Sequence, residues 1–343
     1  MQEKIVNRII RKYEPLLILC SGLFIIVLAT ELIDNNLLNR TVTNCLIRVV
    51  IVVGLYIFVG NSGVISFGHM GFMAIGAYAV AWQTCCPGLK PYTMPGLPEL
   101  LLNNTLPNLP AALTAGLLTA VIAFLVGIAL MRLSGIAASI GTFAFLAIVN
   151  AVYSNWTSVT GGTSSISGIP IYVDKWNSLG WALVTITAAF IYQRSRYGLS
   201  LRASREDEVA AKSAGVNIFR QRLLAFSISA FFVGIGGVLY GGFLGILSPD
   251  AFYLNLTLIT MAMLVIGGIN SLSGAVLGVV VLSTFIEILL QIESGITIGA
   301  QTISVPPGVQ EIGLGIFMLL ILIFRNGGIT GNREIVWPKK SSK

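Results

Sequence analysis

Long apolar runs recur along the whole chain, and they limit its possible folds more than any other feature of the sequence. Of its 343 residues, 55% are hydrophobic and only 10% are charged. A helix needs about 20 apolar residues to cross the hydrocarbon core of a bilayer. Ten apolar segments approach or reach that length: 16–33, 45–60, 64–84, 109–131, 134–153, 179–193, 223–247, 256–270, 273–293 and 309–324. The sequence therefore predicts an all-α polytopic membrane protein with about ten transmembrane or re-entrant helices.

Glycine-rich stretches interrupt two of these apolar regions, near residues 60–63 and 267–274. Irregular backbone is tolerated at membrane depth only where protein or a water-filled cavity surrounds it. G-N-S-G-V-I-S begins at Gly60 and G-I-N-S-L-S-G begins at Gly268, in corresponding places of the two halves of the chain. Because paired interruptions of this kind are typical of transporter pathways, we expect a transport route to pass near them.

Basic residues are unevenly distributed among the connections between the apolar segments. All but four of the 21 Lys and Arg residues fall before the first segment, after the fourth, between the sixth and the seventh, or after the last; the four are Arg40, Arg48, Lys90 and Lys175. Because Lys and Arg are retained on the cytoplasmic side, both termini are predicted to be cytoplasmic. The net charge of +7 then fits the anionic inner leaflet, and no nucleic-acid partner is expected.

This distribution also predicts how the chain is divided. We expect a cytoplasmic N-terminal segment at 1–15, a transmembrane domain at 16–324 and a cytoplasmic tail at 325–343. Within the transmembrane domain, residues 194–222 carry seven of the basic residues and are predicted to form a cytoplasmic loop.

The sequence lacks the motifs of the common catalytic and metal-binding sites. It has no G-x-x-x-x-G-K-[ST] phosphate loop, no H-E-x-x-H, no G-x-S-x-G and a single histidine. We therefore predict no catalytic residues, no metal site and no cofactor in this chain. Glu287 is the one carboxylate predicted deep in the membrane, which leaves open an ion-coupled carrier. An intramembrane enzyme would need a nucleophile with a base, and no such set is evident.

The stretch from Ser204 to Asn217 differs from its apolar surroundings, because five of its first nine residues are charged. Ser204 stands three residues before Asp207, as in a capping box, and Glu208 adds negative charge near the helix start. Gly215 is predicted to end the helix in a left-handed conformation. Four residues are spaced to share one face of this helix: Asp207, Ala210, Ala211 and Ala214. A partner would approach such a face closely, although a solvated linker helix has the same pattern.

The pattern E-x-A-A-x-x-x-G, formed by Glu208, Ala210, Ala211 and Gly215, resembles the cytoplasmic coupling loop of ABC importer permeases. Three further blocks extend the resemblance over most of the chain: GNSGVISFGHMGFMAIGAY from Gly60 to Tyr78, MRLSGIAASIGTFAF with NWTSVTGGTSSISGIP between Met131 and Pro170, and SPDAF with GGINSLSGAVLG between Ser248 and Gly278. Together they make the chain similar to the M-type permease subunits of the branched-chain, or hydrophobic, amino acid ABC importers.

The resemblance implies a fold, a function and a set of partners. The fold would be two inverted half-repeats around a central pathway, similar to cobalamin-class importer permeases. The chain would be a permease subunit of the bacterial inner membrane that passes branched-chain or other hydrophobic amino acids into the cytoplasm. Its expected partners are a second, H-type permease subunit, an extracytoplasmic substrate-binding protein and two ATPase subunits that would hold ATP and Mg²⁺ and hydrolyse the ATP.

Two sets of site residues follow from the resemblance and the patterns that carry it. Coupling to the ATPases would fall on Ser204, Asp207, Glu208, Ala210, Ala211, Ala214 and Gly215. The substrate pathway would include Asn61, Ser66, His69, Gly161, Gly162 and Asn270. Gly161 and Gly162 belong to the loop 160–170, which would lie near the mouth that receives substrate, or would simply be a flexible outer connection. A histidine such as His69, next to Gly68 and Gly71, is more often a hydrogen-bonded interior residue than a substrate ligand.

Three positions depart from the family pattern, so the identity of the substrate is left undecided. Ala147 and Asn150 stand where the family often has an acidic residue and an arginine, and Asn270 stands where it usually has glycine. Urea and short-chain amide importers share this architecture, so they stay alternatives to an amino acid importer, as does the ion-coupled secondary carrier.

Overall fold

The structure is a computed structural model that describes residues 2–33, 35–85, 88, 90–293, 296–298, 301–303, 308–325, 327–331 and 333–335. Of the terminal segments expected at 1–15 and 325–343, residue 1 and residues 326, 332 and 336–343 lie outside the described part. Each of the ten predicted apolar segments falls largely within a helix: α1 (Gln2–Ile33), α2 (Asn36–Ser62), α3 (His69–Thr84), α6 (Asn108–Leu130), α7 (Ile136–Asn155), α9 (Lys175–Arg194), α12 (Ile218–Leu244), α13 (Leu254–Gly267), α14 (Leu272–Glu293) and α15 (Val309–Phe324).

Seven stretches of the described chain are helical, long and apolar enough to cross a membrane: Tyr13–Ile33, Asn36–Ser62, Asn108–Leu130, Ile136–Asn155, Ile218–Leu244, Pro249–Gly267 and Leu272–Glu293. The other three predicted segments form α3 and α15, which have 16 residues each, and α9, which carries charged or polar residues at both ends. The chain is therefore an all-α polytopic membrane protein.

Short elements fill the connections between these helices. They are α4 (Lys90–Thr93), α5 (Glu99–Leu102), α8 (Thr157–Thr160), α10 (Arg196–Glu206), α11 (Glu208–Ser213) and the 3₁₀ turn η1 (Pro249–Phe252). Two small antiparallel sheets complete the list, β1 (Ile166–Ser167) with β2 (Ile246–Leu247) and β3 (Ile296–Ile298) with β4 (Gln301–Ile303). In the first sheet Ile166 pairs with Leu247, which joins the predicted outer loop to the end of α12.

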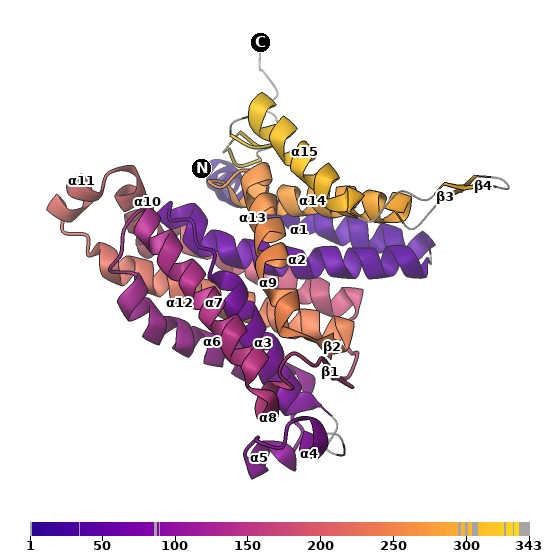
Figure 1. Ribbon diagram of the computed structural model, residues 1–343. Coiled ribbons are helices and arrows are strands. Elements are labelled where there is room, and N and C mark those ends of the chain that lie inside the picture. The colour runs from indigo at the N-terminus through magenta and orange to yellow at the C-terminus, as the bar shows by residue number, and fades with distance from the viewer. Residues whose placement is uncertain are drawn as a thin grey trace.

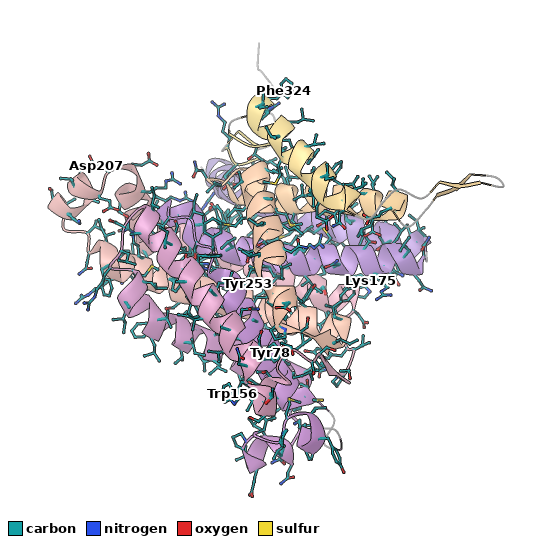
Figure 2. The ribbon with its side chains drawn as sticks, viewed as in Figure 1. Tyr78, Trp156, Lys175, Asp207, Tyr253 and Phe324 are labelled. Carbon is teal, nitrogen blue, oxygen red and sulfur yellow. The ribbon has the colours of Figure 1, made fainter. Side chains whose placement is uncertain are left out.

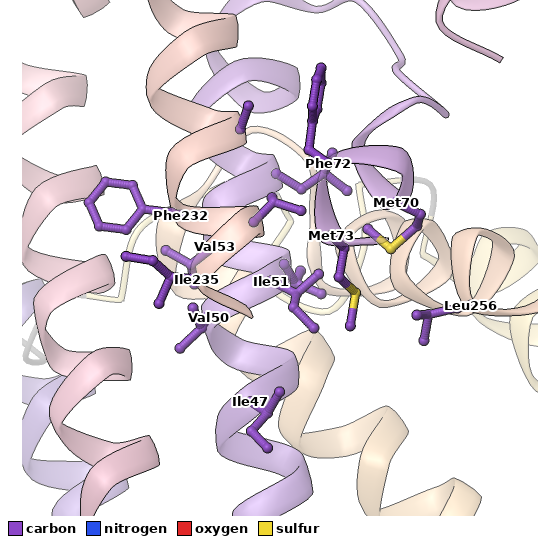
Figure 3. Close-up of a cluster of buried hydrophobic side chains, with 14 of the residues drawn as sticks. Ile47, Val50, Ile51, Val53, Met70, Phe72, Met73, Phe232, Ile235 and Leu256 are labelled. Atoms are coloured by element: carbon purple, nitrogen blue, oxygen red, sulfur yellow. The ribbon is translucent and has the colours of Figure 1, made fainter. Parts of the chain in front are cut away.

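The core lies where α2, α3 and α12 pack against one another (Figure 3). Ile51, Met73 and Ile235 are each buried there, one from each helix. Gly237 of α12 makes this packing possible, because a Cβ at that position would overlap the carbonyl oxygen of Met73. Small residues at such contacts let helix backbones approach closely in a membrane protein.

The helical bundle has one end near α11 and another near α8 (Figure 1). At the end that we call the α11 end, the connections near residues 60–68, 194–217 and 267–272 meet through bonds from Arg202 and Arg205. At the other, the α8 end, Lys175 forms an ion pair with Glu31 and bonds to Asn39. Figure 2 labels Asp207 at the tip of the α11 end, far from Trp156 and Lys175 at the other end.

Candidate functional site

The predicted coupling helix is two helices that meet at Asp207, and the prediction that Ser204 caps it is wrong. Ser204 lies inside α10, is 1% exposed, and its hydroxyl donates to the carbonyl oxygen of Leu201. The cap is Asp207, whose Oδ1 accepts from the amides of Val209 (2.8 Å) and Ala210 (3.0 Å). Ser204 does not act as a cap because α10 already starts at its own cap, Ser195, and its helical hydrogen bonds continue through Ser204.

The residues predicted to share one face of the coupling helix do not all face the same way. Ala210 and Ala214 are exposed, as is Asp207, whereas Ala211 is only 5% exposed and is covered by the chain itself. The difference arises because α11 has only six residues and folds back toward α12. Val209, which the sequence did not single out, is 74% exposed. The exposed apolar residues of α11 and its C-cap are therefore Val209, Ala210 and Ala214, and they lie beside the exposed polar residues Lys212 and Ser213.

The predicted stop at Gly215 is confirmed. Its φ of 82° is in the left-handed region, and the amide of Val216 returns to the carbonyl oxygen of Ala211 at 3.0 Å. Glu208 then forms an ion pair with Arg222 of α12, whose side chain is only 8% exposed. This pair and the turn after Ala214 fix α11 to the start of α12.

Arg202 of α10 binds three side chains of the membrane helices. Its Nε donates to Asn61 Oδ1 at 2.7 Å, and its Nη2 donates to Gln193 Oε1 at 2.9 Å and to Tyr56 OH at 3.1 Å. Tyr56 OH in turn donates to Gln193 Oε1 at 2.9 Å. The guanidinium therefore connects α10 with α2 and α9 through charge-assisted bonds, which are stronger than neutral ones.

Arg205, one helical turn further along α10, joins the two glycine-rich turns. Its Nη1 donates to the carbonyl oxygen of Gly60 and to Oδ1 of Asn270, both at 2.8 Å. Gly63 has a φ of 72°, and its missing Cβ leaves room for the stem of Arg205. We call Arg202 and Arg205 with their bonded partners the arginine clamp. Asn61 and Asn270, predicted along the substrate route, are in the structure partners of this clamp.

The segment after α15 packs on the turn between α13 and α14. Glu334 accepts from the amides of Leu272 (2.9 Å) and Ser273 (3.0 Å), which are the first residues of α14. Thr330 Oγ1 donates to the carbonyl oxygen of Gly267 at 3.0 Å. A carboxylate at a helix N-terminus is stabilised by the free amides and the helix dipole. The turn that holds Asn270 is therefore bound from two sides.

Ser66 and His69, also predicted for the pathway, meet in the interior. His69 Nδ1 lies 2.8 Å from Ser66 Oγ, and His69 is 1% exposed. The rings of Phe58, Phe72 and Phe226 surround it, with centroids 5.6, 6.0 and 5.3 Å away. The structure thus favours the interpretation of His69 as an interior, hydrogen-bonded histidine.

Gly161 and Gly162 lie at the α8 end, in an ordered loop. Both have positive φ, 71° and 61°, and the Gly162 amide donates to Thr160 Oγ1. Thr160 Oγ1 itself donates to the carbonyl oxygen of Tyr153 at 2.6 Å, and Trp82 Nε1 donates to that of Val159 at 3.0 Å. The start of this loop is therefore bonded to α3 and α7.

Next to that loop, a small cavity lies between α3, α7 and η1. Its lining includes Asn150, Tyr153 and Phe252. Asn150 Nδ2 is buried and has no hydrogen-bond partner among the described residues. Sequence reasoning had noted Asn150 only as a departure from the family pattern; the cavity beside its unpaired amide has a volume of about 10 Å³, room for no more than about one water molecule.

Glu287 of α14 has a basic neighbour that the sequence did not reveal. Arg48 of α2 lies on a helix that packs against α14, although no ion pair joins it to Glu287 in the described part of the chain. A half-buried carboxylate beside an arginine is typical of structural contacts as well as of ion-coupled transport, so Glu287 alone does not favour a carrier.

Comparisons with known proteins agree with the architecture. Residues 37–324 match the family described as branched-chain amino acid transport system, permease component. The chain is 30% identical, over 274 residues, to the high-affinity branched-chain amino acid transport system permease proteins LivM of Salmonella typhimurium and Escherichia coli; the match covers 70% of the chain and 60% of either relative. It is also 26% identical over 239 residues to the autoinducer 2 import system permease protein LsrC of Escherichia coli, covering 65% of the chain and 66% of that protein. No solved structure matches the chain.

Proposed function

The chain belongs to the family of branched-chain amino acid transport permeases, and we propose that it is the membrane-spanning subunit of an ATP-driven importer for branched-chain or other hydrophobic amino acids. In this proposal the chain provides the route across the membrane and performs no chemistry. Two ATPase subunits bind and hydrolyse ATP with Mg²⁺, an extracytoplasmic protein delivers the substrate, and a second permease subunit completes the pathway.

The observation that carries the proposal is the α10–α11 arm. Val209, Ala210 and Ala214 form a small apolar surface on a helix that projects from the bundle. An apolar surface on a short helix next to so many charged residues is stable in water only at a cost, which a partner groove would remove. We assign this surface, together with the Asp207 cap and the Gly215 stop that shape it, to the ATPase contact.

The arginine clamp explains how movement of α11 would reach the membrane helices. α11 follows α10 directly, and α10 holds α2, α9 and the α13–α14 turn through Arg202 and Arg205. Glu208 and Arg222 make a second connection, to α12. A push on α11 by an ATPase would therefore displace several pathway helices together, which alternating access requires.

Two inverted half-repeats with ten crossing or re-entrant segments stay part of the proposal on the family resemblance alone. Arg205 bonds to both glycine-rich turns, at Gly60 and at Asn270, so these two turns lie at the same end of the bundle. We propose that the α11 end is cytoplasmic, in keeping with its basic connections, and that the α8 end receives the substrate.

The test is a substitution on the exposed surface of α11. We predict that Ala210→Glu leaves the permease inserted and folded but abolishes uptake and substrate-stimulated ATP hydrolysis, because it places an unpaired charge in the partner groove. Ala211→Glu is a poorer test, since Ala211 is buried within the chain itself. Uptake and ATPase assays on the reconstituted complex measure the effect.

Lys212→Ala is the matched control, because Lys212 is exposed on the same helix outside the apolar surface. Exposed sites of this kind change stability by only about 0.5 kcal/mol. An Ala210→Glu complex that still transports at near the unmodified rate would overturn the proposed coupling role. Uptake that follows a proton or sodium gradient without any ATPase would instead support the ion-coupled carrier.

A further inference from the structure

A groove runs along the surface between α6 and α12 and ends at two arginines. It encloses about 550 Å³, a volume typical of ligand sites. Its sides are apolar and are formed mainly by Phe124 and Ile128 of α6 and by Leu224 and Ile228 of α12. Both helices are long and apolar enough to cross a membrane, so the sides of the groove lie at membrane depth.

The arginines lie at one mouth of the groove, on the α11 side. Arg132 follows the end of α6, and its guanidinium carbon lies 5.8 Å from the centre of the Phe219 ring. Arg220 is in the first turn of α12. In the described part of the chain, no carboxylate lies within ion-pair distance of either guanidinium, whereas their neighbour Arg222 is paired with Glu208. Two exposed and uncompensated cations therefore stand where an apolar groove leaves the membrane.

We infer that this groove binds an anionic phospholipid, with the phosphate between Arg132 and Arg220 and an acyl chain along Phe124, Ile128, Leu224 and Ile228. Guanidinium groups bind phosphate oxygens through paired N–H donors. The sides offer the acyl chain an apolar surface whose one hydroxyl, that of Ser227, already donates to the carbonyl oxygen of Leu223. Charge complementarity favours an anionic over a zwitterionic lipid, because the arginines have no acidic residue beside them. A free anion would leave the apolar groove uncovered.

The site lies next to the coupling arm. Arg220 is five residues beyond Gly215, and Arg132 begins the connection from α6 to α7. A lipid phosphate bound to both arginines would hold this connection against the start of α12. The inference depends on the membrane location of the chain and goes beyond the proposed transport function.

The experiment compares two lipids with the same acyl chains, dioleoylphosphatidylglycerol and dioleoylphosphatidylcholine, bound to the purified full-length chain in detergent and counted by native mass spectrometry. We expect the anionic lipid, dioleoylphosphatidylglycerol, to bind more tightly than dioleoylphosphatidylcholine. In the double variant Arg132→Gln/Arg220→Gln its affinity should fall about a hundredfold, because two guanidinium contacts, each contributing about tenfold, are both lost. Arg194→Gln is the matched control, because Arg194 is exposed at the end of α9 and does not line the groove.

A second variant tests the acyl chain separately. Ser227→Trp fills the groove without changing its charge and should also weaken binding of dioleoylphosphatidylglycerol. Unchanged binding in either variant, with the Arg194→Gln protein folded and behaving the same, would overturn the assignment. Equal binding of the two lipids would overturn it as well, and so would displacement of the lipid by millimolar inorganic phosphate alone, since the groove would then contribute nothing.

Discussion

The α11 end and the α8 end are both held by polar contacts, but the contacts differ in kind. At the α11 end, two guanidinium groups on one short helix reach α2, α9 and the α13–α14 turn. At the α8 end, neutral donors on several elements bond to nearby main-chain carbonyls, as Trp82 does to Val159 and Thr160 to Tyr153. The ion pair described there, Lys175 with Glu31, is partly exposed.

This difference in how the contacts are distributed bears on the roles proposed for the two ends. Contacts gathered on α10 mean that a displacement of this one helix moves the glycine-rich turns of both halves of the chain. At the α8 end the contacts are local: neutral donors bond to nearby carbonyl oxygens, and the buried Lys90 donates to the carbonyl oxygens of Leu101 and Asn104, only 11 and 14 positions away. In the proposed importer, the α11 end would transmit movement and the α8 end would hold the mouth of the route.

The largest effect is expected from breaking the arginine clamp. In Arg205→Gln the bonds to Gly60 and Asn270 are lost, and with them the connection between the two turns. Loss of hydrogen bonds from a charged group costs about 1.5–3 kcal/mol of stability, and we expect uptake to fall by about tenfold or more. Substrate-stimulated ATP hydrolysis should persist in part, because the α11 surface is unchanged. Uptake and ATP hydrolysis measured on one reconstituted sample give the number of substrate molecules transported per ATP hydrolysed.

A smaller effect is expected at Glu334. Glu334→Gln keeps an oxygen acceptor near α14 but removes the charge that faces the amides of Leu272 and Ser273. Weakening a helix cap costs about 0.5–2 kcal/mol. Hydrogen exchange at those two amides should become faster while Arg205 keeps its bonds, so uptake should change less than in Arg205→Gln. Unchanged exchange at Leu272 and Ser273 would show that the carboxylate does not cap α14 in solution.

The control from the other end is Lys175→Gln. Glu31, its partner, is half exposed, and ion pairs of this kind contribute about 0–1 kcal/mol. We expect a small loss of thermal stability and near-normal coupling of ATP hydrolysis to uptake. A coupling defect as large as that of Arg205→Gln would remove the proposed distinction between the two ends.

The helices were predictable from the sequence because the signal for a membrane helix is local. A run of apolar residues is enough to place α2 or α12, and a glycine in the left-handed region is enough to end α11 at Gly215. The start of α11 was not predictable in the same way. Ser204 and Asp207 are both good caps, and only the continuation of α10 from Ser195 through Glu206 decides between them.

The arginine clamp was not predictable because its partners are far apart in the sequence. Arg202 and Asn61 are separated by 141 positions and Arg205 and Gly60 by 145, and in the sequence both arginines are simply basic residues of a predicted cytoplasmic loop. The burial of Ala211 likewise depends on how α11 folds against its neighbours rather than on its spacing along a helix. The sequence did single out Asn61 and Asn270, but for a substrate route instead of this contact.

The most direct test of the two-ended account is accessibility labelling of single cysteines at Ser213 and Ser165, both exposed in the structure. An impermeant maleimide should label Ser213→Cys only from the cytoplasmic side and Ser165→Cys only from the outer side. Bound ATPase subunits should protect Ser213→Cys and leave Ser165→Cys unchanged. Labelling of both cysteines from the same side, or labelling of Ser213→Cys that the ATPase does not slow, would contradict the account.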